Sequence, residues 1–198
     1  MTILSDIRTR VRKDLHDTDA GNYRWTDSQL DRHIERALSD LSLAAPQEKT
    51  ATIATMGGSR DISLSSLAGL LEVEAVEYPV GEFPPSLVEY SRWASTLTLN
   101  VETLPSGGNA KLFYTARHTL DGSGSTVQPE LEDALAIGAA AFAALELSSY
   151  TTDRVTTGAD VARQYAAWGN AWQMAFRELL RMHARRNRVR PRRMYVPA

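Results

Sequence analysis

The sequence predicts an α+β protein: an α-helical bundle of four main helices with an inserted antiparallel β domain and an extended basic C-terminal tail. Three observations support this prediction. Apolar residues recur at spacings of three and four near both ends of the chain, the spacing changes to two over about residues 50–118, and eight of the last 22 residues are Arg. The predicted boundaries are 1–48 and 123–186 for the two halves of the bundle, 49–122 for the β domain and 187–198 for the extended arm.

The first half of the bundle contains two predicted helices. The apolar residues of the first recur every three or four positions: Leu4, Ile7, Val11 and Leu15. The second begins at Thr26, an N-cap residue with Gln29 at the capping-box position, while Trp25 and Leu30 occupy the two hydrophobic-staple positions. Such a cap contributes about 1 kcal/mol. The helix is expected to end before Pro46.

The segment from about Thr50 to His118 reads as antiparallel strands. Apolar and polar residues alternate in three stretches, which carry the apolar sets Leu71, Val73 and Ala75; Leu97, Leu99 and Val101; and Leu112, Tyr114 and Ala116. The turn residues at 105–109 predict a hairpin between strands 96–102 and 110–117. Alternation also places Glu72 and Glu74 on a solvated face, which is a commoner explanation for these carboxylates than catalysis.

Two further helices follow a Gly/Ser loop. Pro129 suits the first turn of a helix, and small residues recur in the stretch that follows, where they would let another helix or subunit approach closely: Gly138, Ala141 and Ala144. The last helix has an apolar seam with alternating spacings of four and three: Val161, Tyr165, Trp168, Trp172, Ala175, Leu179 and Met182. Gly138, Ala141, Ala144, Trp168 and Trp172 are therefore the predicted subunit contacts.

Composition excludes several chemistries. The chain has no Cys, so disulfides, thiol nucleophiles and Cys-based metal sites are absent. The four His (residues 16, 33, 118 and 183) show no metal-ligand spacing, and no nucleophile or phosphate-loop motif occurs. The most apolar run, 134–145, is too short to cross a bilayer. We expect no catalytic residues, no metal, no cofactor and no membrane association.

The C-terminal tail departs most from the rest of the chain. Residues 177–198 carry eight Arg and one Glu, giving +7, whereas residues 1–176 carry −9. Such a tail could be a solubilising end or an arm that binds phosphates or an acidic protein surface. The apolar triplet Met194, Tyr195 and Val196 favours an arm that inserts into a partner. Its predicted binding residues are Arg185, Arg186, Arg188, Arg190, Arg192, Arg193, Met194, Tyr195 and Val196.

Four segments together resemble the head-to-tail adaptor (connector) proteins of tailed bacteriophages. They are YRWTDSQLDRHIERALSDL (23–41), LEVEAVEYP (71–79), LEDALAIGAAAFAALELSSY (131–150) and ARQYAAWGNAWQMAFRELLRM (162–182). The resemblance implies a structural virion protein, made in the host cytoplasm and located in the neck between head and tail. It implies a homo-oligomeric ring, commonly twelvefold, which lies beneath the portal protein, encloses the DNA channel without binding DNA specifically, and docks the next neck or tail-completion protein.

The resemblance also implies that a C-terminal extension docks onto the portal, which agrees with the character of the basic tail. The β segment is larger than in minimal members of the family, and we expect it on the outside of the ring. Two other interpretations stay open at this point. The chain could be a nucleic-acid-binding protein that uses its Arg-rich tail, or an enzyme without a familiar motif, because architecture alone does not fix function.

Overall fold

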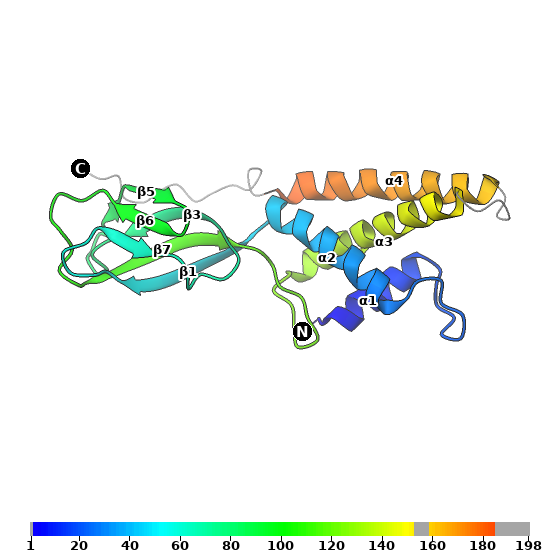
Figure 1. Ribbon diagram of the computed structural model, residues 1–198, viewed down its shortest axis with the longest axis horizontal. Helices are drawn as coiled ribbons and strands as arrows, with labels where there is room; N and C mark the ends of the chain where they lie inside the picture. Colours follow the sequence, from blue (N-terminus) through cyan, green and yellow to red (C-terminus); the bar gives the residue numbers. More distant parts are fainter. Residues whose placement is uncertain (1, 153–158, 185–198) are drawn as a thin grey trace. The chain divides into compact units, whose positions relative to one another are not determined.

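The computed structural model describes residues 2–152 and 159–184. The chain divides into two compact units, a helical unit built from both ends of the chain, up to Pro46 and from His118 onward, and a β unit over Gln47–Arg117 (Figure 1). The helices are α1 (Leu4–Asp14), α2 (Asp27–Ala44), α3 (Pro129–Thr152) and α4 (Ala159–His183). All strand pairs in the β unit are antiparallel. The predicted helices and antiparallel sheets are confirmed, whereas the tail beyond 184 lies outside the described residues.

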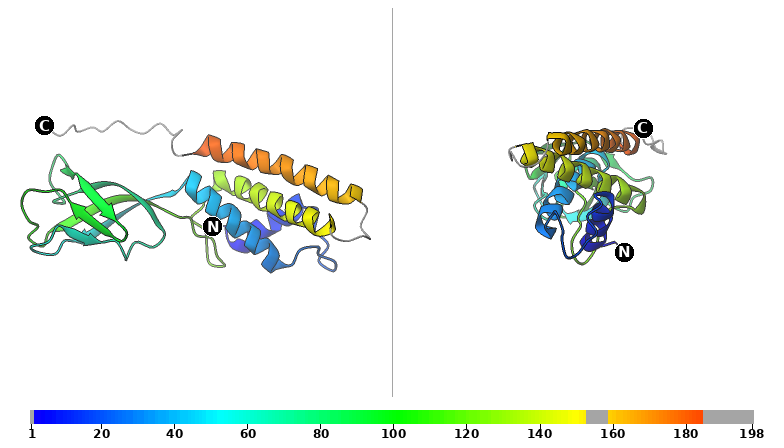
Figure 2. Two further views of the ribbon diagram at one scale, coloured as in Figure 1. Left: turned by 45° about the horizontal axis from the view of Figure 1, so that its top comes forward. Right: turned by 90° about the vertical axis from the view of Figure 1, so that its right-hand side faces the viewer.

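In the helical unit, α3 lies at the centre and packs against the other three helices. Figure 2 shows α4 on one side of α3 and α1 with α2 on the other. Because it is surrounded, α3 is apolar around most of its circumference, with Leu131, Leu135 and a run of fully buried Ala residues. Its N-terminal end begins at Pro129, as predicted. Helix α3 is thus the central helix of the unit, and the other three helices pack on it.

The local signals of the first two helices are confirmed. Thr26 caps α2: its side-chain oxygen accepts from the Gln29 backbone N–H at 3.3 Å, and Gln29 Oε1 accepts from the Thr26 backbone N–H at 2.8 Å. Both staple residues are buried, as are the main positions of the two predicted stripes: Ile7, Val11, Leu15, Leu30, Ile34, Ala37 and Leu41. The two helices therefore present their apolar stripes to the core as the periodicity requires.

A buried ion pair fixes the connection between α1 and α2. The Arg12 guanidinium donates to Asp17 at 2.6 Å, to the Trp25 carbonyl at 3.0 Å and to Asp27 at 2.8 Å. It also lies 3.6 Å from the centre of the Tyr23 ring. Both the Arg12 and the Asp17 side chains are almost fully buried. The pairing of these charges holds the loop 15–26 against the end of α1.

The β unit consists of two sheets with a common core. The larger sheet has the order β1 (Gln47–Ala54), β7 (Asn109–Ala116), β3 (Leu70–Glu77), β4 (Leu87–Val88), and the smaller has the order β2 (Asp61–Ser63), β6 (Thr96–Leu99), β5 (Tyr90–Trp93). Residues from both sheets meet in one hydrophobic cluster. A hydrogen bond from the Tyr90 hydroxyl on β5 to the Val73 carbonyl on β3 also joins the sheets. The unit therefore has a core of its own.

Two details of the predicted strands are wrong. The predicted hairpin between 96–102 and 110–117 does not form, because β6 pairs with β2 and β5, whereas β7 pairs with β1 and β3 in the other sheet. In β3, register shifts against β7 break the simple alternation, so Val73 and Val76 are buried three residues apart. Glu72 is exposed as predicted, whereas Glu74 is half-buried.

The chain enters and leaves the β unit at neighbouring positions. Gln47, the first residue of β1, is paired with Ala116, the last residue of β7. Just beyond this pair, the buried His118 ties the two chain segments together inside the helical unit. Its backbone N–H donates to Ser42 Oγ at 3.0 Å, and its ring nitrogens lie 2.8 Å from the Ala45 carbonyl and 3.0 Å from the Thr126 carbonyl. This histidine has a structural role.

Candidate assembly surfaces

The small residues predicted as subunit contacts lie inside the chain's own helical unit. Ala141 and Ala144 are fully buried on α3. Gly138 faces α4: a Cβ added there would lie 2.8 Å from the ring of Phe176. The reverse arrangement occurs at Gly169 on α4, where an added Cβ would lie 2.8 Å from Leu145 on α3. Close packing of α3 against α4 thus explains these small residues within one chain, and their contact with another subunit stays a prediction.

The predicted seam of α4 is out of phase with the observed one. The face that packs on α3 carries Ala162, Gly169 and Phe176, spaced seven apart, with Phe176 only 1% exposed. Three positions of the predicted seam are exposed instead: Val161, Ala175 and Met182. Two of the three inward residues are small, so the inward face does not stand out as hydrophobic in the sequence. The large aromatic residues indicate a different seam, and in the structure they lie at the edge of the face that packs on α3.

The aromatic residues of α4 line a groove beside the loop that follows α1. Trp168 and Trp172 are half-buried with ring centres 4.5 Å apart, and the His16 ring stacks on Trp168 at 6.1 Å. The Arg24 guanidinium contacts the Tyr165 hydroxyl at the same place. This groove has a volume of about 510 Å³. The two half-buried Trp residues thus contact their own chain, and their contact with another subunit stays a prediction.

The outer face of α4 is largely apolar over two turns. Its exposed residues there are Ala167, Ala171, Met174 and Ala175, with the polar Asn170 among them, and Met174 is 71% exposed. Toward the C-terminal end of α4, Arg177 makes no ion pair with any described residue, whereas Arg181 donates to Glu178. A helix face with this composition is typical of a contact with another protein surface.

A second groove lies between α1, α2 and the loop after His118. It has a volume of about 350 Å³. Its apolar lining consists of Leu4, Ile34, Leu38 and Leu120, and its acidic residues are Asp31, Glu35 and Asp121. Asp31 is held by a two-pronged contact with Arg8 at 2.9 Å. The groove therefore combines an apolar lining with acidic groups.

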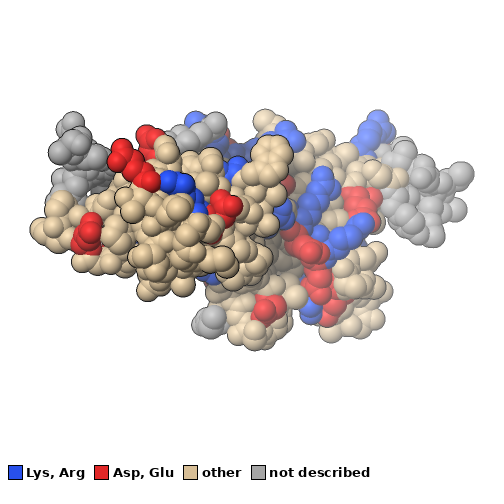
Figure 3. Space-filling view, turned by 60° about the vertical axis from the view of Figure 1, so that its left-hand side comes forward, with Lys and Arg blue, Asp and Glu red and all other residues tan. Residues whose placement is uncertain are grey.

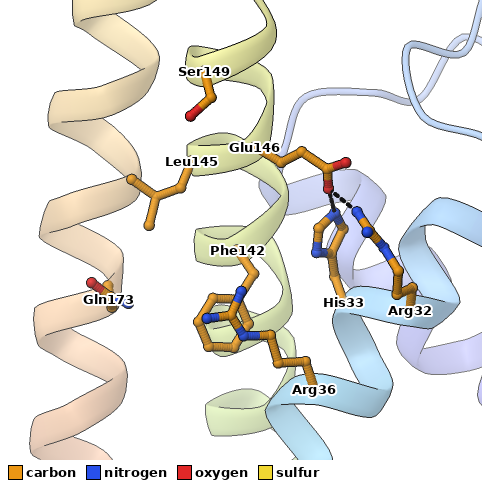
Figure 4. A pocket seen from close by; sticks show the side chains of 8 residues that line it. All are labelled: Arg32, His33, Arg36, Phe142, Leu145, Glu146, Ser149 and Gln173. Atoms are coloured by element: carbon orange, nitrogen blue, oxygen red, sulfur yellow. Dashed lines mark hydrogen bonds and ion pairs between the residues drawn. The ribbon is translucent and has the colours of Figure 1, made fainter.

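A polar pocket lies where α2, α3 and α4 meet, and Figure 4 shows Glu146 of α3 pointing toward His33 and Arg32 of α2. Glu146 forms an ion pair with Arg32, and its carboxylate lies 2.7 Å from His33 Nε2. That contact falls short of hydrogen-bond geometry. Burial lowers the pKa of His33 and outweighs the opposing effect of Glu146, while the charge of Arg32 lowers it further. The nearby Arg36 guanidinium lies 4.1 Å from the Phe142 ring centre.

This histidine should make the helical unit less stable in mild acid. Because its folded pKa lies below the ordinary 6.5, the unfolded chain binds a proton that the folded chain does not as the pH falls through 6.5. The free energy of unfolding should therefore decrease over that window. His33→Gln should flatten this dependence in urea titrations between about pH 7 and pH 5, and Glu146→Gln should steepen it. An unchanged slope in His33→Gln, relative to a His183→Gln control, would contradict the assignment.

Charges on the surface are mixed rather than separated by sign. Figure 3 shows Lys and Arg side chains beside Asp and Glu side chains on the face in view. The same mixing holds for Arg10, which bridges to Glu132 and Asp133 at 2.8 Å each. Several acidic side chains in the described part of the chain are therefore paired with a nearby base.

The β unit exposes apolar side chains on its connecting loops. Met56 and Leu104 are exposed on loops that are joined by a hydrogen bond from the Gly58 N–H to the Pro105 carbonyl at 2.8 Å. Phe83 is 85% exposed on the β3–β4 connection, and Trp93 is 87% exposed at the β5–β6 turn. The turn places Ala94 at a positive φ of 50°. These residues give the β unit an apolar surface of its own.

Within the described residues, no cluster of His, Asp and Glu has the arrangement of a metal site, and none of the described helices is long and apolar enough to cross a membrane. The predicted arm, Arg185, Arg186, Arg188, Arg190, Arg192, Arg193, Met194, Tyr195 and Val196, lies outside the described residues. What the described part offers is a helical frame with an exposed apolar helix face, two grooves and an inserted β unit. These features are candidate surfaces for contacts with other proteins.

Comparison with known proteins gives the family. Residues 1–195 match the family described as SU10 adaptor protein, and the chain belongs to that family. This membership confirms the resemblance that the four sequence segments indicated. The chain is a structural protein of the phage virion neck and not an enzyme.

Solved structures with similar chains come from phage-like particles. One is the neck of a native GTA particle computed with C12 symmetry (14% identity, 83% of this chain and 92% of that chain, TM-score 0.30). Another is the neck of an empty GTA particle computed with C6 symmetry (15%, 83% and 87%, 0.30). A third is the virion of a native gene transfer agent particle (17%, 87% and 92%, 0.29). TM-scores this low carry no argument about function. No curated protein matches the chain.

Proposed function

We propose that this adaptor forms a homo-oligomeric ring of twelve subunits beneath the portal protein, where it encloses the DNA channel and docks the next neck or tail component. Membership of the adaptor family is the observation that carries the proposal. The largely apolar exposed face of α4 supports the proposal, because each subunit of a ring buries part of its surface against the neighbouring subunit. In this arrangement DNA passes through the ring without specific binding.

The C-terminal arm is the proposed portal-docking element. Its charge supports this role: residues 177–198 carry +7 beside −9 in the rest of the chain. The Arg residues would pair with portal carboxylates and set the rate and register of approach, while Met194, Tyr195 and Val196 would fill an apolar groove and slow dissociation. All of these contacts are with protein, which distinguishes this role from nucleic-acid binding through the same arm.

The β unit is proposed to lie on the outside of the ring and to contact a neck or tail-completion protein. Its separate core supports an independent module. Its exposed Phe83 and Trp93 support a contact with protein, since large aromatic side chains are enriched at the centres of protein interfaces.

Deletion of residues 188–198 tests the arm. The truncated chain should keep the circular dichroism spectrum and unfolding midpoint of the full chain but lose binding to purified portal rings by at least about 100-fold. As a matched pair in the full chain, Tyr195→Ala should weaken portal binding at high salt more than Arg192→Ala does, because salt screens the charge contacts and leaves the apolar ones.

Two outcomes would overturn this proposal. One is unchanged attachment of the truncated chain to portal-bearing heads. The other is tight binding of the full chain to double-stranded DNA, with affinity falling steeply as salt rises and with the same loss on truncation. That second result would favour the nucleic-acid-binding alternative.

A further inference from the structure

We infer that neighbouring subunits of the ring meet through two different surfaces: the outer face of α4 on one copy inserts into the groove between α1, α2 and the loop 119–121 of the next copy. The inference rests on the proposed ring and names the surfaces that would form it. The occupant of the groove is thus a second copy of this chain. The structure supplies three arguments for the match.

The first argument is shape and apolarity. Met174 projects from a stretch of α4 whose other exposed residues are the small Ala167, Ala171 and Ala175 and the polar Asn170. Such a face lets a neighbouring surface approach the helix backbone while Met174 fills a depression in it. The groove offers that depression, about 350 Å³ in volume, with Ile34 as a fully buried part of its lining and Leu4, Leu38 and Leu120 half-buried around it.

The second argument is charge. On α4, the guanidinium of Arg177 lies one turn beyond Met174 and has no ion-pair partner among the described residues. In the groove, Glu35 is exposed and likewise has no ion-pair partner among the described residues, whereas Asp31 is already engaged by Arg8. An Arg177–Glu35 contact between copies would pair two charges that have no ion-pair partner in the described part of either chain.

The third argument is placement. Figure 2 shows α4 on one side of α3 and α1 with α2 on the other, and α4 touches α2 only at a few positions, so the outer face of α4 and the groove are two different surfaces of the helical unit. A contact between two unlike surfaces repeats from copy to copy and closes into a ring when the rotation permits. If α4 instead paired with α4 of another copy, the contact would be two-fold and would stop at a dimer.

Engineered cysteines test this directly, because the natural chain has none. Met174→Cys and Leu38→Cys would be introduced together, and the protein treated with a short thiol–thiol cross-linker after assembly on portal rings. We expect a ladder of covalent oligomers on denaturing gels for the double variant and no cross-linked species for either single variant. A dimer from Met174→Cys alone would show an α4–α4 contact and overturn the inference.

A charge exchange gives an independent measurement. Arg177→Glu and Glu35→Arg should each reduce the number of copies per portal by at least about 10-fold at low protein concentration, and the combined variant should restore it. Asp40→Arg is the matched control, since Asp40 is exposed on α2 but does not line the groove. Equal losses in the control and in Glu35→Arg, or no recovery in the combined variant, would overturn the pairing.

The design separates this inference from the proposed function. If electron microscopy shows rings on the portal but the double-cysteine variant gives no ladder, the ring stands and the assigned surfaces are wrong. If no ring forms under any condition, the proposed function itself fails. If the double-cysteine variant gives a ladder only after deletion of residues 188–198, the arm of a neighbouring copy, and not α4, occupies the groove of the full chain, and the inference is likewise overturned.

Discussion

Gly138→Leu should unfold the helical unit more severely than most single substitutions in this chain. The ring of Phe176 occupies the position that any side chain at residue 138 would need, with three ring atoms within 2.9 Å of an added Cβ. A leucine must therefore push α4 away from α3 or force the ring out of the core. Overpacking of this kind costs about 3 kcal/mol or more, which corresponds to a decrease of about 10 °C in the unfolding midpoint, measured by circular dichroism at 222 nm.

The chain offers controls for this prediction. Gly122→Leu, in a loop where nothing lies within 4 Å of an added Cβ, should change stability by less than about 0.5 kcal/mol. Gly138→Ala combined with Phe176→Leu should be more stable than the sum of the two single changes indicates, because the smaller side chain leaves room for the new methyl group. A fully stable Gly138→Leu variant that still assembles would contradict the packing of α3 on α4 described above.

Asp17→Ala should have an effect of similar size at the other end of the helical unit. The substitution removes the 2.6 Å partner of Arg12, and it leaves the Arg24 N–H, which donates to Asp17 at 2.8 Å, without that acceptor. Removing one member of a buried ion pair costs about 3–5 kcal/mol, because the other charge stays in a poorly solvated place. Urea unfolding should show this loss with little dependence on salt, since buried pairs are weakly screened.

Asp19→Ala is the matched control for Asp17→Ala. Asp19 lies in the same loop but is exposed, and it accepts a hydrogen bond from the Gly21 N–H at 3.0 Å. Its loss should cost less than about 1 kcal/mol. If both substitutions have equal effects, the Arg12–Asp17 pair does not fix the loop between α1 and α2.

The sequence predicted correctly those parts of the fold that depend on residues close together in the chain. The start of α2 depends on Thr26, Gln29 and the flanking apolar pair, all within six residues, and it forms as predicted. Strand partners depend on distant residues instead. The alternation around Leu97 and Leu112 indicates two strands correctly, yet nothing local states that they belong to different sheets, and the turn residues at 105–109 suit a loop between sheets as well as a hairpin.

The candidate surfaces were predictable to a smaller degree. Small residues on α3 indicate a close approach without saying whether the approaching group is in the same chain or in another. Gly138 and Phe176 are 38 residues apart in sequence, and only the structure shows that one makes room for the other. The aromatic residues of α4 indicate a seam on the helix face next to the one that packs on α3. The groove near Glu35 combines residues from three separate segments and has no signature in any of them.

The paired ends of the β unit have an evolutionary consequence. Because Gln47 and Ala116 are partners across one antiparallel ladder, and His118 fastens both flanking segments to the helical unit, the whole insertion is attached as a single hairpin would be. A chain that lost residues 47–117 would need only a short turn to rejoin its helices. Recombination between phage genomes could therefore replace this module with another of different size and specificity, while the helical unit is inherited unchanged.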